Sequence, residues 1–203
     1  SSPGTILEVG AYCGLFLKEV GLRGWKGTGV EPSAWASAYA RDAIGVDVRT
    51  GFLDEVKPQL SPQYDVVVSW DVLEHVRDPL AYLKLCGTFL PTGGTLAIST
   101  LDVDTWMPRL LGKRWPWLMN MHIFYFSRGT LKTLLANAGF ELVHCASYVH
   151  YASLRHFFRG GLRLLPGFLQ ALGERLIFLV PQRILIPVAF GDIKLFVAKK
   201  VAP

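Results

Sequence analysis

Short apolar runs alternate with longer segments of helical period along most of the 203 residues of this chain. Apolar runs that are bounded by turn residues are typical of buried strands. Because helical segments separate successive runs, the pattern indicates an α/β fold with a mainly parallel sheet. Seven strands are predicted, at residues 5–9, 27–30, 46–48, 64–69, 95–99, 141–148 and 193–198.

Capping residues place helices between several of these strands. Ser33 and Ser127 are good N-caps, and Pro79 suits the first turn of a helix. Glycine or proline follows where two of these helical patterns end, and neither residue continues a helix well. Three helices are therefore predicted, at residues 34–42, 79–90 and 128–138.

Residues 101–121 depart from the alternation of strands and helices. They hold Trp106, Trp115 and Trp117 and show little periodicity. The segment leaves the carboxyl end of the fifth strand, where α/β sheets bind ligands, so it is well placed to form a substrate loop or lid. The alternative is a surface loop whose tryptophans pack onto the core.

Residues 152–190 also depart from the alternation. The segment is apolar, and Pro166, Pro181 and Pro187 divide it into pieces that predict short helices. It lies between the sixth and seventh predicted strands. We therefore expect a single domain over residues 1–203, with a helical insertion at about 152–190 before the last strand.

Three arginines of this insertion, Arg155, Arg159 and Arg163, fall at i, i+4 and i+8 along a helix. Apolar residues such as Leu154 and Phe158 fall largely on the other side. The simpler interpretation is the solvated face of an amphipathic helix that covers the core. The alternative is a helix that lies on an anionic membrane or faces a lipid-like substrate.

Composition limits the classes of protein to which the chain can belong. Hydrophobic residues make up 51% of the chain, which is enough for a core without disulfides or metals. Cys13, Cys86 and Cys145 are far apart and form no metal-binding or disulfide pattern, so a reducing cytoplasm is the expected compartment. Asp102 and Asp104 lack a third ligand, so no metal site is predicted.

Charge and hydropathy add further limits. The formal net charge of +5 is mild and the basic residues are not in one block, so no nucleic-acid partner is expected. The opening residues, SSPGT, have neither the charged nor the apolar region of a signal peptide. No apolar run reaches about 18 residues, so no transmembrane helix is predicted.

The most informative stretch runs from Ile6 to Pro32. It predicts a strand, a turn with Gly10 and Gly14, a helix, and a second strand that ends in Glu31. This arrangement is typical of a nucleoside pocket, because the glycine turn admits a ligand to the backbone and the distal acid can accept hydrogen bonds from ribose hydroxyls.

The glycine turn also indicates which cofactor it suits. A dinucleotide site needs G-x-G-x-x-G, but Tyr12 stands where the second glycine would be, and a pyrophosphate would meet its ring. The chain contains no G-x-x-x-x-G-K-[ST] phosphate loop. A cofactor without phosphates fits better, and S-adenosylmethionine is the common one.

Five motifs in order resemble class I S-adenosylmethionine-dependent methyltransferases of the small-molecule type. They are LEVGAYCG (7–14), GVEPS (29–33), YDVVVSWDVLEHVRDP (64–79), LPTGGTLAIST (90–100) and HIFYFSRGTLKTLLANAGFELV (122–143). The last resembles the segment before the sixth strand of ubiquinone-type O-methyltransferases. The resemblance covers residues 5–148 and a closing strand near 192–199.

This resemblance implies a Rossmann-like, doubly wound sheet of seven strands, mainly parallel with an antiparallel last strand and with helices on both faces. Family members usually carry helices before the first strand. Because this chain opens almost directly on that strand, we expect a fragment or a missing front piece.

The resemblance also implies a set of cofactor-binding residues. Glu31 would accept hydrogen bonds from both ribose hydroxyls. The alternative is a purely structural role, in which an acid beside the N-cap stabilises the start of the helix through its dipole. In the family, the acid of the first strand organises the glycine loop near the cofactor's ammonium group. The predicted set is Glu8, Gly10, Ala11, Tyr12, Gly14, Glu31, Pro32, Phe52, Leu53, Asp71, Val72 and Leu73.

Two histidines, His75 and His122, are the candidates for a catalytic base, because an imidazole titrates near neutrality. The preferred hypothesis is methyl transfer from S-adenosylmethionine to an oxygen of a small or lipid-like acceptor. One alternative is an inactive, methyltransferase-like domain that docks a partner or a membrane through its apolar C-terminal helices. A nicotinamide oxidoreductase shares the fold, but the missing second glycine argues against it.

Overall fold

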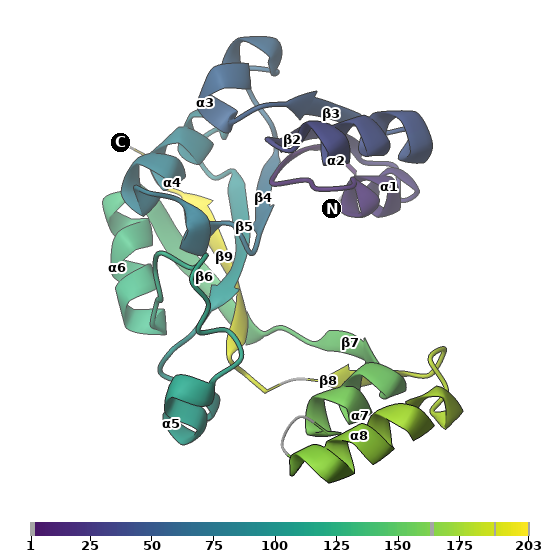
Figure 1. Cartoon of the computed structure of the whole chain (residues 1–203). Helices are drawn as coiled ribbons and strands as arrows, with labels where there is room; N and C mark the ends of the chain where they lie inside the picture. Colours follow the sequence, from purple (N-terminus) through teal and green to yellow (C-terminus); the bar gives the residue numbers. More distant parts are fainter. Residues whose placement is uncertain (1–2, 163–164, 189, 203) are drawn as a thin grey trace. The chain divides into compact units, whose positions relative to one another are not determined.

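The computed structural model describes residues 3–162, 165–188 and 190–202 of the chain. The chain divides into two compact units (Figure 1). The first unit comprises Ser1–Ser147 and Gly191–Pro203, and the second comprises Tyr148–Phe190.

The first unit is built on one sheet of seven strands in the order β3-β2-β1-β4-β5-β9-β6. Neighbouring strands are parallel except at β9, which is antiparallel to both β5 and β6. This architecture confirms the predicted doubly wound sheet with an antiparallel last strand. The strands are β1 (Thr5–Val9), β2 (Lys26–Glu31), β3 (Asp47–Thr50), β4 (Val66–Trp70), β5 (Thr95–Leu101), β6 (Phe140–Ser147) and β9 (Ile193–Lys200).

The order of strands reverses beside β1, which pairs with β2 on one side and with β4 on the other. Val9 lies opposite Val30 of β2 and Ser69 of β4. The carboxyl ends of β1, β2 and β4 therefore meet at one edge, at the switch point where sheets of this kind bind ligands.

Helices pack on both faces of this sheet and begin where the capping residues predict. The Oγ of Ser33 accepts a hydrogen bond from the amide of Ala36, and the Oγ of Ser127 accepts one from the amide of Thr130. The helices are α1 (Leu15–Gly21), α2 (Ala34–Tyr39), η1 (Ala40–Ile44), α3 (Leu53–Val56), η2 (Lys57–Gln59), η3 (Leu73–His75), α4 (Pro79–Thr88), α5 (Trp106–Leu111), η4 (Gly112–Arg114) and α6 (Arg128–Asn137).

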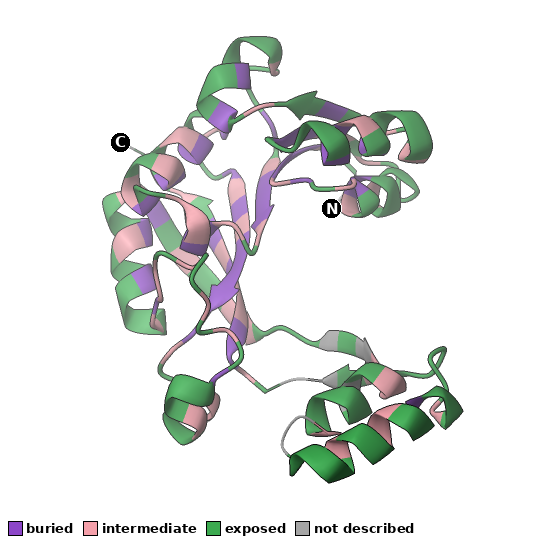
Figure 2. Ribbon diagram, in the orientation of Figure 1, coloured by how far each residue is buried: buried purple, intermediate pink, exposed green. Residues whose placement is uncertain are grey.

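The core of the first unit lies between the sheet and its helices, and Figure 2 shows the buried residues concentrated along the central strands. Leu7, Val67 and Leu96 of neighbouring strands are completely buried, as is Leu131 of α6. Side chains that are buried on both faces of a strand explain why the predicted strands read as continuous apolar runs.

The second unit contains two helices and a two-stranded ladder. The helices are α7 (Leu154–Leu162) and α8 (Gly167–Leu176), and η5 (Ile177–Leu179) follows α8. The sequence analysis predicted short helices here but missed the antiparallel ladder of β7 (His150–Ser153) and β8 (Leu185–Val188). Pro187 lies in β8, which is tolerated because the ladder has only two strands and both are edges.

The second unit falls on the segment for which an insertion into a single domain was expected, and its status as an insertion stays a prediction. Among the described residues, no helix is both long and apolar enough to cross a membrane.

Candidate active site

The turn after β1 is held against β2 by two hydrogen bonds. The amides of Gly10 and Ala11 donate to the carbonyl of Val30, at 2.9 and 3.0 Å. Gly10 has φ +80°, and a Cβ at this position would lie 2.5 Å from Cγ2 of Val72, the second residue after β4. The turn therefore needs a glycine here for both its backbone conformation and its close approach to the loop after β4.

Tyr12 occupies the turn in a left-handed conformation, with φ +44°. Its side chain is 63% exposed, and its ring lies 6.4 Å from the ring of Trp35 on α2. The ring is thus turned outward, so a tyrosine at this position does not by itself fill the turn with a side chain. Tyr12 therefore gives no support to the alternative of an inactive, methyltransferase-like domain.

Glu31 ends β2 and is 7% exposed. One carboxylate oxygen accepts a hydrogen bond from the amide of Tyr12 and the other accepts one from the amide of Ser33, both at 2.8 Å. Each oxygen keeps further acceptor capacity, which two ribose hydroxyls could use. The two bonds hold the carboxylate at the predicted place, beside the glycine turn and the start of α2.

Glu8 lies in β1 with only 3% of its surface exposed. Burial, followed by the negative charge of Glu31, raises the pKa of Glu8 to about 8. Its Oε2 has no hydrogen-bond partner among the described residues. A buried acceptor of this kind is costly until a donor pairs with it, and the ammonium group of a methionine moiety is such a donor. The site therefore fits S-adenosylmethionine.

Asp71 directly follows β4 in a left-handed conformation, with φ +53°. Its amide donates to the hydroxyl of Ser99 at 3.0 Å, and that hydroxyl donates back to Oδ1 of Asp71 at 2.7 Å. Val72 meets the glycine turn, whereas Leu73 is 1% exposed and packs in the core. Only the backbone of Leu73 remains available to a ligand.

The loop after β3 reaches the same edge, because the amide of Gly51 donates to the carbonyl of Glu31 at 3.0 Å. Phe52 is 61% exposed there, while Leu53 is buried in the core. Phe52 and Leu53 both belong to the predicted cofactor-binding set, and only Phe52 offers an accessible apolar side chain. Pro32 is exposed at the end of β2.

Two further predicted residues, Ala11 and Gly14, are closely packed against the rest of the first unit. Ala11 is 5% exposed and packs in a small cluster with Leu17 and Val48. Gly14 has φ +73°, and a Cβ there would lie 2.5 Å from Cγ2 of Val46. Both residues shape the turn by close packing.

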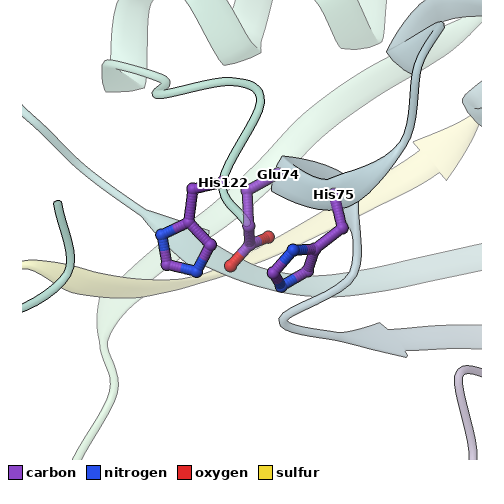
Figure 3. Close-up of side chains that lie close together, drawn as sticks. All are labelled: Glu74, His75 and His122. Atoms are coloured by element: carbon purple, nitrogen blue, oxygen red, sulfur yellow. The ribbon is translucent and has the colours of Figure 1, made fainter. Parts of the chain in front are cut away.

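The two candidate histidines lie together, with their ring centroids 4.8 Å apart (Figure 3). His75 and Glu74 belong to η3, whereas His122 comes from the segment before α6. Figure 3 shows the carboxylate of Glu74 close to both rings. The carbonyl of Glu74 accepts hydrogen bonds from the amides of Ile123 and Phe124, which hold the two segments together.

Backbone carbonyls determine which nitrogen of each ring is available. Nδ1 of His75 lies 2.9 Å from the carbonyl of Met121, and Nδ1 of His122 lies 2.7 Å from the carbonyl of Trp117. A carbonyl only accepts hydrogen bonds, so both Nδ1 atoms carry a proton. In the neutral rings, the lone pair therefore lies on Nε2 of each histidine.

The surroundings also change the acidity of this cluster. Burial raises the pKa of Glu74, which is 2% exposed and whose Oε2 accepts a hydrogen bond from Thr100 at 2.9 Å. Loss of solvation lowers the pKa of His122, because the charged ring is disfavoured away from water. His122 is thus kept in its neutral, proton-accepting form.

Glu74, His75 and His122 could also hold a metal ion, since one ligand atom from each lies within 4.8 Å of the other two. From the sequence, only Asp102 and Asp104 were considered as metal ligands, because His122 is far from Glu74 and His75 along the chain. Asp104 turns toward Arg109, 3.7 Å away, while Asp102 accepts a hydrogen bond from the amide of Asp104.

Residues 101–121 were expected to form either a substrate loop or a surface loop whose tryptophans pack onto the core, and their tryptophans differ in burial. Trp115 is 4% exposed, and its Nε1 donates to Asp192 at 2.8 Å, so this part packs onto the core. Trp106 is 56% exposed. The carbonyl of Trp117 orients His122, so the segment also contributes directly to the histidine pair.

Trp70, at the end of β4, lies at the same edge of the sheet but was not among the residues predicted for the site. Its Nε1 is buried without a hydrogen-bond partner among the described residues, and its ring meets Phe16 edge-on at 5.3 Å. An indole at this position gave no signal in the sequence, because aromatic residues are common in strands.

Comparisons with known proteins agree with this geometry. A family model described as "Methyltransferase domain" matches residues 1–145. The ubiquinone biosynthesis O-methyltransferase of Aeromonas salmonicida is 30% identical over 170 residues, which cover 77% of this chain and 70% of that protein. The enzyme of the same name from Marinobacter nauticus is 33% identical over 103 residues, covering 47% of this chain and 43% of its own length.

Solved structures share the fold at low sequence identity. A SAM-dependent methyltransferase from Archaeoglobus fulgidus has a TM-score of 0.64 and 18% identity, covering 98% of this chain and 86% of its own. Magnesium protoporphyrin IX methyltransferase from Synechocystis PCC 6803, solved with bound SAH, has a TM-score of 0.61 and 13% identity, covering 98% of this chain and 74% of its own.

The chain spans less than half the length of several of the curated relatives that it matches, including the one from Marinobacter nauticus. Its family model nevertheless covers well over half of the chain, including the glycine turn, Glu31 and the histidine pair. This chain belongs to the S-adenosylmethionine-dependent methyltransferases.

Proposed function

We propose that this methyltransferase transfers the methyl group to an oxygen of a small, lipid-like acceptor. The observation that carries the proposal is the pair of histidines with free Nε2 atoms on the loops that follow β4 and β5. An acceptor hydroxyl arrives protonated and needs a base, whereas the methyl group is already activated by the sulfonium of the cofactor. The chain's similarity to ubiquinone biosynthesis O-methyltransferases supports an oxygen acceptor and a quinone-like substrate class.

The chain's own residues then bind and orient the cofactor. Glu31 would accept hydrogen bonds from the ribose hydroxyls, and Phe52 would supply an apolar surface for the adenine. The turn from Gly10 to Gly14 would bind the methionine portion, with the unpaired Oε2 of Glu8 available to accept a hydrogen bond from its ammonium group. Asp71 would contribute to the edge of this pocket.

His122 is the base in this proposal. Its Nε2 carries the lone pair, its lowered pKa keeps the ring neutral, and its Nδ1 proton is held by the carbonyl of Trp117. His75 has the same tautomer and lies against it, so it can orient the acceptor hydroxyl or take over the proton.

A second candidate follows from the same cluster. A divalent cation held by Glu74, His75 and His122 would bind the acceptor oxygen and lower its pKa, which removes the need for a free base. Activity measured after dialysis against a chelator, and again after restoring zinc or magnesium, separates this candidate from the histidine base.

The proposal is tested first at the cofactor. Calorimetric titration of the folded protein with S-adenosylmethionine and its demethylated product should give binding for both, and the absence of heat for both contradicts the assigned pocket. Methyl transfer to phenolic and catecholic lipids is then assayed with His122→Gln alongside. An enzyme that methylates only nitrogen acceptors, or that keeps full rate in that variant, overturns the proposed chemistry.

A further inference from the structure

The second unit exposes an unusual amount of apolar surface. Among its described residues only Ile177 is a buried hydrophobic residue, at 8% exposure. Phe168, Leu172, Phe178 and Leu179 are between 55% and 75% exposed. Figure 2 shows the exposed colour over most of α7 and α8. A contiguous surface of this kind, in a unit with almost no core, marks a site of interaction.

The apolar residues of α8 form one stripe. Phe168, Leu172 and Leu176 follow at i, i+4 and i+8, and Leu179 continues the row in η5. A different side of α8, which holds Gly173 and Glu174, packs on α7: a Cβ at Gly173 would meet the side chain of Leu162, and Glu174 pairs with Arg159. The stripe is therefore turned away from α7, and no described residue of the second unit covers it.

The charge of the second unit is strongly one-sided. Residues 148–190 contain five arginines and a single acidic residue, Glu174. This unit thus carries most of the chain's formal net charge of +5. Glu174 lies on the α7 side of α8 and pairs with Arg159 at 3.1 Å, so the outer side of the helix pair bears no acid. Arg175 and Arg183 are exposed.

We propose that α8 and η5 dock on an anionic phospholipid surface. An exposed apolar stripe with Arg175 beside it, on a unit whose single acidic residue is paired on the α7 side, is complementary to the interface between acyl chains and negatively charged headgroups. Arg175 precedes the last stripe residue of α8 and can reach a headgroup while its carbon stem lies on the apolar surface. Such docking would bring the methyltransferase to a lipid-like acceptor, although the docking itself does not depend on which acceptor is methylated.

Polar contacts hold α7 against α8 and η5 without involving the apolar stripe of α8. The guanidinium of Arg155 on α7 donates to the carbonyls of Phe178 and Val180, at 3.0 and 2.9 Å. With the ion pair of Arg159 and Glu174, these bonds fix α7 against α8 and η5 by polar contacts. The apolar side chains of α8 are thereby left for a surface outside the unit.

The test measures co-sedimentation of the full chain with vesicles of phosphatidylcholine, with and without added phosphatidylglycerol. We expect binding to the anionic vesicles that weakens as salt is raised, because the arginines contribute through charge. Phe168→Ser should weaken this binding by about tenfold or more, since it removes a ring from the acyl region. Leu22→Ser is the matched control, because Leu22 is also 75% exposed but lies in the first unit, and it should bind as the unaltered protein does.

Three outcomes overturn the proposal. The first is a folded full chain that does not sediment with the anionic vesicles. The second is equal binding by Phe168→Ser and Leu22→Ser. The third is a concentration-dependent dimer that Phe168→Ser dissolves and anionic vesicles do not compete with, because a second copy then covers the stripe. Calorimetry with S-adenosylmethionine on Phe168→Ser should show unchanged affinity, which separates lost docking from a damaged methyltransferase fold.

Discussion

Two buried glutamates at the carboxyl edge of the sheet, Glu8 and Glu31, differ in the hydrogen bonds that their carboxyl groups receive. Glu31 receives a backbone amide on each oxygen, which compensates for the burial of its charge. Glu8 has one oxygen without a partner and a pKa raised to about 8. This difference agrees with the proposed roles, in which Glu31 binds hydroxyl groups and Glu8 binds a positively charged donor.

Replacement of Glu31 tests the first of these roles. Glu31→Gln removes the charge and replaces one acceptor oxygen by an NH2 group, which cannot accept a hydrogen bond, so we expect S-adenosylmethionine to bind more weakly by on the order of 1–3 kcal/mol in calorimetry. Glu19→Gln, an exposed change on α1, should leave affinity unaltered. Equal affinities for the two variants would show that Glu31 serves only the start of α2.

Glu8 makes stability depend on pH. Its pKa is raised in the folded protein, so the folded state binds the proton more tightly than the unfolded state does. Its contribution to stability is fully present below about pH 4.5 and is lost as pH rises toward about 8. Urea unfolding should show Glu8→Gln gaining on the order of 1–3 kcal/mol over the unaltered protein at pH 8 and much less at pH 5. A gain that is the same at both pH values contradicts this assignment.

At the scale of elements, the site depends on turns that join strands at one edge of the sheet. The turn after β1 meets the loop after β4 through Gly10 and Val72, and it meets α2 through Tyr12 and Trp35. Local patterns predicted these elements well, because caps and turns depend on neighbouring residues. The helix predicted to end at residue 42 continues to Ile44 as a short π-helical turn.

Gly14 offers a test of the turn with a matched control in the same region. Gly14→Ala imposes both a left-handed backbone and a contact with the side chain of Val46, whereas Gly45→Ala imposes the left-handed backbone alone, at φ +80° with no atom within 4 Å. We expect Gly45→Ala to cost about 1 kcal/mol and Gly14→Ala to cost about 1–3 kcal/mol more in thermal or urea unfolding. Equal losses would mean that the turn relaxes without strain.

At the scale of the whole molecule, the histidine pair depends on the long segment between β5 and α6, which brings His122 back to η3. Trp115 anchors that segment to Asp192, and the carbonyl of Glu74 binds its far end. His122 is thereby set against His75, although the two residues are far apart in sequence.

The proposed base is tested by rate and by pH. His122→Gln should lower kcat by about 10²–10⁴-fold with little change in cofactor affinity, while His144→Gln, an exposed change on β6, should have no effect. The base must be neutral to act, so the rate should rise with pH through the pKa of His122. Because burial lowers that pKa, the rise should come below the usual histidine range. A rise above that range, or a slow His144→Gln, argues against the assignment.

The sequence was sufficient to predict the alternating α/β order, the caps, the glycine turn and the acid at the end of β2. Each of these features depends on residues within a few positions of one another. The tertiary structure alone decided the outward direction of the ring of Tyr12, the unpaired oxygen of Glu8, and the meeting of Glu74 and His75 with His122. It also decided the β7–β8 ladder and the exposed stripe of α8. These features depend on which distant segments pack together and on which polar atoms that packing leaves without a partner, and no local pattern carries that information.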